Sequence, residues 1–314
     1  MLPFDPLFRN PHWQTIAGHY WPRPSSTAWP LKSRFVQTEP GVQVLVQSQF
    51  PHSAPAPTPA LVLVHGLEGS GSAGYIRGLA AGALARGWVA HRFHMRTCGG
   101  TEHLSNTLYH AGLTSDLHTV LRQIGPAFLV GFSLGGNVVL KLAGELGERG
   151  PELIRGICAV STPLDLAACA RRIAEPDNRL YELRFIRRMR ARLLATGRFS
   201  ASDFAGLRRL FDLDDRITAP AFGFRGAAEY YETQSAIHFL PRIRVPALLV
   251  QAKDDTFIPY GIFESAAVGS NPHIELVATG EGGHLGFLGR RPHRFWADRV
   301  ILDWIGLHTS PQSP

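Results

Sequence analysis

The chain has 314 residues, of which 45% are hydrophobic and 18% charged, and its 32 Lys and Arg against 25 Asp and Glu give a net charge of +7. This composition is that of a globular protein with a sizeable core, and it excludes an intrinsically disordered chain. The cationic excess is local, because residues 171–209 contain eleven arginines and only four acidic residues. A nucleic-acid-binding protein usually spreads basic side chains over a whole face, so we expect no nucleic-acid partner.

Cysteine usage and the N-terminal residues bear on the compartment. The three cysteines, Cys98, Cys158 and Cys169, are odd in number and form no C-x-x-C pair, which argues against a disulfide scaffold or a zinc ribbon. The segment Met1–Asp5 lacks the basic start and apolar run of a signal peptide. The sequence contains no run of about 18–20 apolar residues, the length that would predict a transmembrane helix. We therefore expect a cytoplasmic protein.

The first sixty residues predict an arm, two strands and a loop. Residues 1–30 are rich in Pro and aromatic residues without periodicity, and we expect an irregular arm whose tryptophans pack on the core. Alternating residues predict antiparallel strands at Arg34–Thr38 and Val42–Phe50. The proline-rich segment Pro51–Pro59 predicts a loop, since it suits neither a strand nor a helix.

From residue 60 onward, predicted strands and helices alternate. The strands are expected at Ala60–Val64, Trp88–Phe93, Ala127–Phe132, Ile154–Ser161, Ala247–Ala252 and Ile274–Ala278. The helices are expected at Ala73–Arg86, Leu113–Ile124, Gly135–Leu146 and about Pro292–Ile305. Such alternation is typical of parallel βαβ units, and it predicts an α/β fold with a mostly parallel, doubly wound sheet of about eight strands.

The alternation lapses at about residues 162–245, which predicts a helical cap inserted into a single domain of residues 1–314. Apolar residues recur every three or four positions in its arginine-rich part, at Leu180, Leu183, Ile186, Met189 and Leu193. This spacing predicts an amphipathic helix that packs its apolar stripe on the core. Its arginines form either a solvated face or a cationic lid that attracts acidic substrates or an anionic membrane surface.

The segment Gly131–Gly135 reads G-x-S-x-G, with the apolar run Ala127–Val130 before it and a helical pattern after it. This context predicts a nucleophile elbow, in which Ser133 lies on a strained strand-to-helix turn. Side chains at positions 131 and 135 would collide with neighbouring backbone there. The helix N-terminus would favour negative charge developing at the serine.

A serine nucleophile needs a base and an acid that orients the base, and in this fold they follow in the order Ser, Asp or Glu, His. His284 lies in the glycine-rich loop after the last predicted strand, and we expect it to be the base. Two adjacent carboxylates, Asp254 and Asp255, follow the strand Ala247–Ala252. The pattern D-x-x-[IV]-P favours Asp255 as the acid and leaves Asp254 to support the loop.

Two backbone N–H groups are expected to stabilise the oxyanion. One belongs to Leu134, directly after the serine, and the other to Leu67 in the glycine-rich loop at residues 65–71. His65, beside that loop, is expected to hold it in place rather than to transfer protons.

We expect neither a cofactor nor a metal. The loop at residues 65–71 contains neither G-x-G-x-x-G nor G-x-x-x-x-G-K-[ST], so a phosphate-binding role is weakly supported. His91 and His94 lie three apart on a predicted strand and would point to opposite faces, which makes them a poor metal pair.

These motifs together resemble the YheT-like branch of the α/β-hydrolases, an esterase group with bacterial, yeast and plant members and animal acylglycerol or phospholipid hydrolases. The matching segments span almost the whole chain: residues 10–15, 65–70, 109–112, 131–137, 211–212, 230–231, 252–255 and 282–287. The resemblance implies an α/β-hydrolase fold and a charge relay of Ser133, Asp255 and His284. One departure is Thr97 in Arg96-Thr97-Cys98, where relatives commonly carry Arg-Gly-Cys.

The function expected is that of a serine carboxylic-ester hydrolase acting through an acyl-enzyme on short-chain or glycerolipid esters. An acyltransferase that passes the same acyl group to an alcohol is an alternative. A catalytically silent binding protein on the same scaffold is another. The expected partner is a small ester or lipid substrate, and no obligate protein partner is inferred.

Overall fold

The computed structural model describes residues 2–53 and 58–309. Its strands are β1 (Lys32–Glu39), β2 (Val42–Gln49), β3 (Ala60–Val64), β4 (Val89–Phe93), β5 (Ala127–Phe132), β6 (Ile154–Val160), β7 (Ala247–Ala252) and β8 (Ile274–Thr279). Its helices are α1 (Pro11–Tyr20), α2 (Gly74–Ala85), α3 (Ser115–Ile124), α4 (Leu134–Leu146), α5 (Leu166–Ile173), α6 (Arg179–Ala195), α7 (Leu210–Leu213), α8 (Ala219–Ala221), α9 (Ala227–Gln234), α10 (Ala266–Gly269) and α11 (Trp296–Thr309). Part of the predicted Pro51–Pro59 loop lies outside the described residues.

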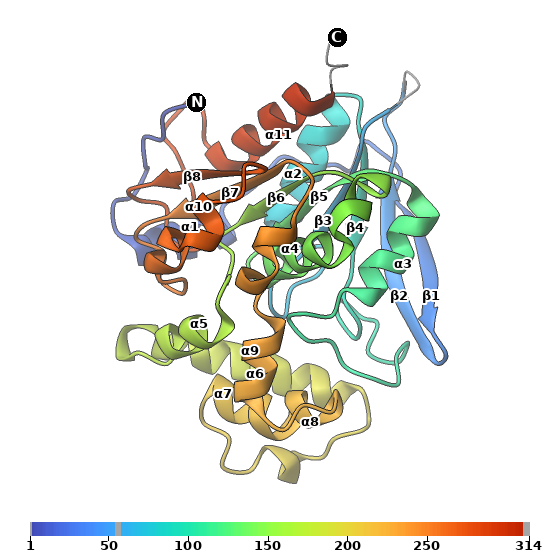
Figure 1. Ribbon diagram of the computed structural model, residues 1–314, viewed down its shortest axis with the longest axis vertical. Helices are drawn as coiled ribbons and strands as arrows, with labels where there is room; N and C mark the ends of the chain where they lie inside the picture. The colour runs from blue at the N-terminus through green and yellow to red at the C-terminus, as the bar shows by residue number, and fades with distance from the viewer. Residues whose placement is uncertain (1, 54–57, 310–314) are drawn as a thin grey trace.

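The eight strands form one sheet in the order β1-β2-β4-β3-β5-β6-β7-β8 (Figure 1). The β1–β2 and β2–β4 pairs are antiparallel and the remaining pairs are parallel. The predicted sheet and strand positions are therefore confirmed. The central strand β5 is buried along its whole length, as its continuous apolar run predicted.

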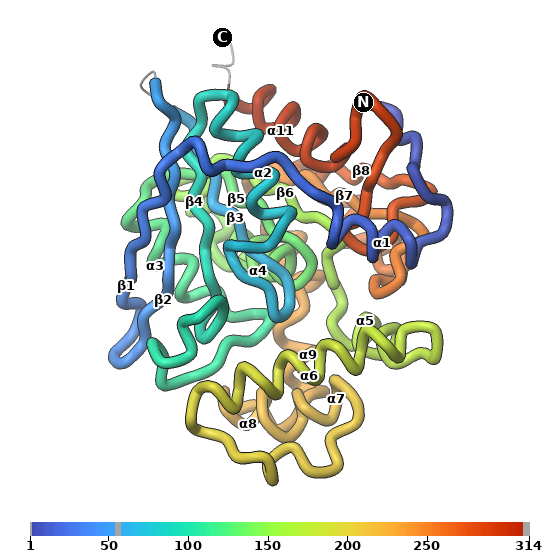
Figure 2. The backbone as a smooth tube through the Cα atoms, turned by 180° about the vertical axis from the view of Figure 1, so that it is seen from behind, coloured from blue at the N-terminus to red at the C-terminus, as the bar shows by residue number. Residues whose placement is uncertain are grey.

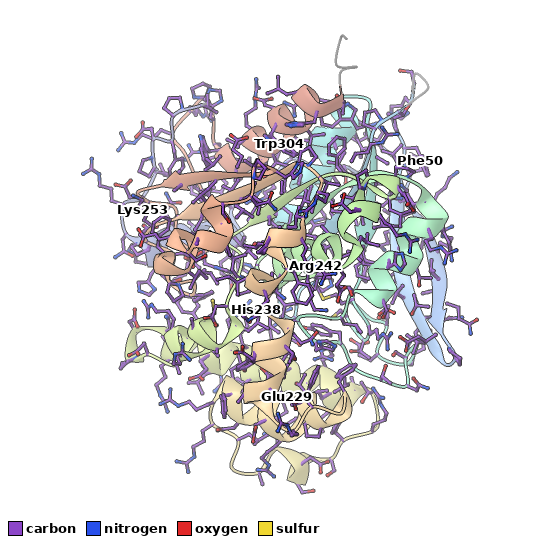
Figure 3. The ribbon with its side chains drawn as sticks, in the orientation of Figure 1. Phe50, Glu229, His238, Arg242, Lys253 and Trp304 are labelled. Carbon is purple, nitrogen blue, oxygen red and sulfur yellow. The ribbon has the colours of Figure 1, made fainter. Side chains whose placement is uncertain are left out.

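Helices cover both faces of the sheet. Side chains alternate along β3, so Leu61 and Leu63 enter one core with α2 and α11, while Val62 and Val64 enter another with α3 and α4. Trp304 of α11, labelled in Figure 3, belongs to the first core. The last helix begins at Trp296 rather than Pro292, since residues 288 and 295 first pair in a short β-bridge.

The prediction of an irregular N-terminal arm is wrong for residues 11–20, which form α1. The helix starts because the Asn10 side chain accepts hydrogen bonds from the N–H groups of His12 and Trp13, with Pro11 at the first helical position. Trp13 is 61% exposed, so it does not pack on the core as expected. The opposite face of α1 is buried.

Five helices, α5 to α9, lie between β6 and β7 and form a layer at one end of the sheet (Figures 1 and 2). The predicted apolar stripe of α6 is only partly correct. Met189 and Leu193 are buried, whereas Leu180 is 81% exposed. Arg192, which the pattern placed on the basic face, is buried because it pairs with Glu68 of the sheet domain.

Within residues 2–53 and 58–309, no helix combines the length and apolarity that crossing a membrane requires.

Candidate active site

Ser133 lies at the turn between β5 and α4. Its backbone has φ 52° and ψ −124°, a left-handed conformation that is strained for a residue with a side chain. A Cβ atom on Gly135 would lie 2.5 Å from the carbonyl oxygens of Val64 and His65, and one on Gly131 would collide with the Gly135 carbonyl group. The predicted steric need for both glycines is confirmed.

The structure brings Ser133, His284 and Asp255 together. The His284 Nε2 atom lies 3.0 Å from the Ser133 Oγ atom, and its Nδ1 atom lies 3.1 Å from both carboxylate oxygens of Asp255. The three residues follow β5, β8 and β7 respectively, and the carboxyl ends of these parallel strands share one edge of the sheet. In this arrangement Nδ1–H can donate to the carboxylate while Nε2 accepts the hydroxyl proton.

The two adjacent carboxylates occupy different positions. Asp255 is buried and accepts hydrogen bonds from the N–H groups of Phe257 (2.9 Å) and Ile258 (3.1 Å), which fix its carboxylate against His284. Asp254 accepts a 2.8 Å hydrogen bond from the Gly283 N–H group, and burial raises the pKa of its carboxyl. Asp254 thus supports the loop that carries the histidine, whereas the sequence led us to expect that it supports its own loop after β7.

Helix α1 holds the same loop from the other side. The His284 N–H group donates to Thr15 Oγ1 (2.9 Å), and the Gln14 side chain pairs with both the carbonyl and the N–H group of Leu288 (3.0 Å each). Sequence reasoning did not assign these residues a role. The helix-start signal at Asn10 and Pro11 could have located the helix, but not its contact with residues 284–288.

Two backbone N–H groups near the serine make no hydrogen bond within the described residues. Leu134 is the first residue of α4, so its N–H group has no intrahelical acceptor. The Leu67 N–H group makes no hydrogen bond within the described part of the chain, and Leu67 and Ser133 line the same cavity. At neighbouring Gly66, a Cβ atom would lie 3.0 Å from the Ser133 Cβ atom, so the loop passes close to the serine.

His65 fixes this loop. Its Nδ1–H group donates to the Gly66 carbonyl (2.8 Å), and its Nε2 atom accepts from the Met95 N–H group (3.2 Å). Burial lowers the pKa of His65 to about 3, so the ring is neutral at physiological pH. Both ring nitrogens are occupied, in agreement with the expected holding role.

A buried ion pair joins the loop to the cap. The Arg192 Nε atom of α6 donates to both carboxylate oxygens of Glu68 (2.9 and 3.1 Å), and its guanidinium lies 4.7 Å from the centre of the Tyr109 ring. The Tyr109 hydroxyl in turn accepts from the Glu68 N–H group (3.0 Å) and donates to its carboxylate (3.1 Å). Burial works against the charge of Arg192, yet Glu68 keeps the pKa of the guanidinium above its usual value.

Thr97, the departure from the Arg-Gly-Cys pattern, belongs to the same network. Its backbone has φ 60°, a conformation that favours glycine. Its hydroxyl oxygen accepts a 2.7 Å hydrogen bond from Arg192 Nη1, an interaction that glycine could not make. The threonine therefore adds a contact between the cap and the sheet domain at the cost of some backbone strain.

A cavity opens at Ser133 between the sheet and the cap. Its walls are mostly apolar and include Leu134, Leu166, Ile173, Phe185, Met189, Leu210, Phe257 and Ile258. The Phe257 ring lies 4.5 Å from the His284 ring, measured between centres, so the apolar wall reaches the histidine. Such a cavity suits an apolar chain attached to a group at the serine.

The Cys169 thiol lies on the cavity wall, whereas Cys98 and Cys158 do not line the cavity. All three cysteines are unbonded and buried, and burial raises the pKa of each thiol. No group of three or more His, Cys, Asp or Glu side chains among the described residues is arranged to hold a metal ion.

Asp214, on the cavity wall, gives a pH-dependent prediction. Burial raises its pKa to about 6 from 3.8, although Tyr231 donates to it at 2.6 Å. The folded protein therefore binds this proton more tightly than the unfolded chain, so the stability contributed by Asp214 falls as pH rises from about 4 to about 6 and stays low above. We expect Asp214→Asn to raise the free energy of unfolding at pH 7 by about 1–3 kcal/mol, a gain that disappears below pH ~4.

Urea unfolding at several pH values measures this effect. The control is Asp215→Asn, which alters the neighbouring exposed carboxylate and should give no such pH-dependent gain. A gain for Asp214→Asn that is equal at pH 4 and pH 7 would contradict the titration of a buried carboxyl.

Comparisons with known proteins identify the family and the fold. A family model described as the alpha/beta hydrolase fold matches residues 59–290. The Escherichia coli (strain K12) protein named "Putative esterase YheT" is 33% identical over 270 residues, which cover 81% of this chain and 78% of that protein. The monoacylglycerol lipase of Saccharomyces cerevisiae is 28% identical over 257 residues, 76% of this chain but only 57% of the yeast protein. The solved structure of the Pyrococcus furiosus esterase Pf2001 has the same fold, with a TM-score of 0.61 at 14% identity over 92% of this chain and 97% of the esterase.

Proposed function

The chain belongs to the α/β-hydrolase family, in the branch of YheT, and on this premise we propose that it is a serine carboxylic-ester hydrolase. The observation that carries the proposal is the hydrogen-bonded line from Ser133 through His284 to Asp255 at the mouth of an apolar cavity.

In the proposed mechanism, the Ser133 oxygen attacks the ester carbonyl carbon while His284 Nε2 takes the hydroxyl proton. Asp255 holds the imidazole in the required tautomer and stabilises the imidazolium that forms. The N–H groups of Leu67 and Leu134 donate to the oxyanion. His284 then returns the proton to the leaving alcohol. Water next attacks the acyl carbon of the acyl-enzyme while His284 takes its proton, and His284 gives this proton to the Ser133 oxygen as the acid leaves.

The cavity supports esters with an apolar acyl chain, either short-chain esters or glycerolipids. Its walls are mostly apolar, and one yeast relative bears the name monoacylglycerol lipase. A series of p-nitrophenyl esters of increasing chain length, with and without lipid micelles, measures the preference. An alcohol added to the same assay separates hydrolysis from acyl transfer, since a transferase would form the new ester in place of the free acid.

Covalent labelling tests the nucleophile directly. A fluorophosphonate probe is expected to label the wild-type protein, because phosphonylation needs an activated serine and an oxyanion site. Ser133→Ala is expected to abolish the label, while a variant of a serine away from the site, Ser202→Ala, should keep it. Absence of labelling on folded wild-type protein would contradict the mechanism.

A further inference from the structure

Helix α1 exposes three large side chains that the fold does not use. Trp13, Ile16 and Tyr20 are 61%, 39% and 67% exposed. Their spacing of three and four residues places them on one face of the helix. The opposite face, with Gln14, Thr15 and Gly18, is buried against residues 284–288.

The first turn of the cap helix α6 continues this surface. Leu180 is 81% exposed. The next residue, Tyr181, stacks on His12 of α1 with ring centres 5.8 Å apart, and Arg184 hydrogen-bonds to the His19 ring at 3.3 Å. Figure 2 shows α1 directly above the cap helices on the same side of the molecule. We call this surface the α1–α6 face, and it consists of Trp13, Ile16, Tyr20, Leu180, Arg184 and Arg187.

The arginines of this face carry positive charge. Arg184 and Arg187, together with the neighbouring Arg179, are exposed and form no ion pair with any described residue. Two acids lie nearby: Asp177 pairs with Arg172 at 2.7 Å and lies 3.9 Å from the His12 ring, and Glu175 is exposed. Burial and the positive charge of the nearby arginines lower the pKa of the His19 ring.

We propose that the α1–α6 face docks on the surface of an anionic phospholipid membrane. Trp and Tyr side chains favour the interface between headgroups and acyl chains, and exposed aliphatic groups can enter it. The surrounding arginines would bind anionic headgroups. A second copy of this chain is a poorer occupant, because two faces of the same positive charge would repel each other across a two-fold contact.

The docking face lies beside the candidate site. Tyr181 and Phe185 of α6 contact the Phe257 ring at 4.8 and 5.7 Å between centres, and Phe257 contacts His284. A protein docked in this way would hold the cavity mouth near the bilayer, where an ester lipid could enter it. That consequence rests on the proposed esterase function, whereas docking itself does not.

The test uses the full chain with vesicles of phosphatidylcholine alone or with phosphatidylglycerol added, and flotation measures the bound fraction. The wild-type protein is expected to bind the anionic vesicles at low salt and to lose most of this binding at high salt. The variant Trp13→Ser/Leu180→Ser should bind about tenfold more weakly, and Arg184→Gln/Arg187→Gln should weaken binding to anionic vesicles by a similar factor.

Two matched controls lie elsewhere. Leu307→Ser changes a leucine of α11 that is 77% exposed, and Arg242→Gln changes an exposed arginine away from α1 (Figure 3). Both should bind vesicles as the wild type does. Three results would overturn the proposal. The wild-type protein could fail to bind anionic vesicles at low salt, or the control variants could lose as much vesicle binding as the α1–α6 variants. The wild type could also form a dimer that the α1–α6 variants dissociate. Hydrolysis of a soluble ester, measured in parallel, separates failure of docking from failure of the esterase function.

Discussion

Ser133→Ala is expected to lower kcat on p-nitrophenyl esters by a factor on the order of 10⁶, with little change in stability. The hydroxyl is the group that attacks the ester in the mechanism, and His284 Nε2, 3.0 Å away, would have no serine proton to remove without it. His284→Ala should cause a loss of similar size, because the two residues act as one unit, and the double variant should be no worse than either single one. Steady-state kinetics with active-site titration measure these effects. Activity of Ser133→Ala within tenfold of the wild type would contradict the nucleophile assignment.

The adjacent carboxylates give the matched comparison for the acid. Asp255→Asn is expected to lower kcat by about 10⁴-fold, because an amide at this position favours the wrong imidazole tautomer. Asp254→Asn removes the same charge one residue away, where the carboxylate accepts from Gly283 rather than from His284. We expect it to reduce kcat by only about tenfold, since the amide oxygen can still accept that hydrogen bond. Reversed effects would assign the acid to Asp254.

The sheet and the three site residues could be predicted because their signals are local. β3, β5 and β7 are short apolar runs, and each is followed within a few residues by glycines or carboxylates. The parallel arrangement brings the ends of β5, β7 and β8 to one edge, so Ser133, Asp255 and His284 could be placed near one another from the sequence.

The rest depends on contacts between distant segments. The exposed and buried sides of α1 are decided by the loop near His284, about 270 residues later in the chain. Periodicity placed Arg192 on a basic surface, but a partner 124 residues away brings it into the interior. Helical periodicity tells on which side of a helix an arginine lies. It does not tell whether an acid from a distant segment meets the arginine there and buries it.

The ion pair of Glu68 and Arg192 is expected to couple the cap to catalysis. Arg192→Met leaves the Glu68 carboxylate buried without its partner, which should cost about 3–5 kcal/mol of stability. Glu68 directly follows Leu67, and two contacts hold it to the cap: the ion pair with Arg192 and the 2.7 Å hydrogen bond from Arg188 to its carbonyl. Loss of the ion pair leaves only the second contact, so the Leu67 N–H group should shift. A displaced oxyanion donor lowers kcat by about 10²-fold and leaves KM nearly unchanged.

Comparison of single and double variants separates positioning from stability. Glu68→Gln/Arg192→Met removes both charges, and its stability should recover to within about 1–2 kcal/mol of the wild type, because no unpaired buried charge remains. Its kcat and its rate of fluorophosphonate labelling should stay low, since only the hydrogen bond from Arg188 to the Glu68 carbonyl then holds the loop to the cap. Arg244→Met is the control, because its ion pair with Glu148 is largely exposed and should contribute about 0–1 kcal/mol. Full recovery of kcat in the double variant would show that the pair only stabilises the fold, whereas a lasting kcat defect in a stable protein would identify Glu68 and Arg192 as positioning residues for the oxyanion loop.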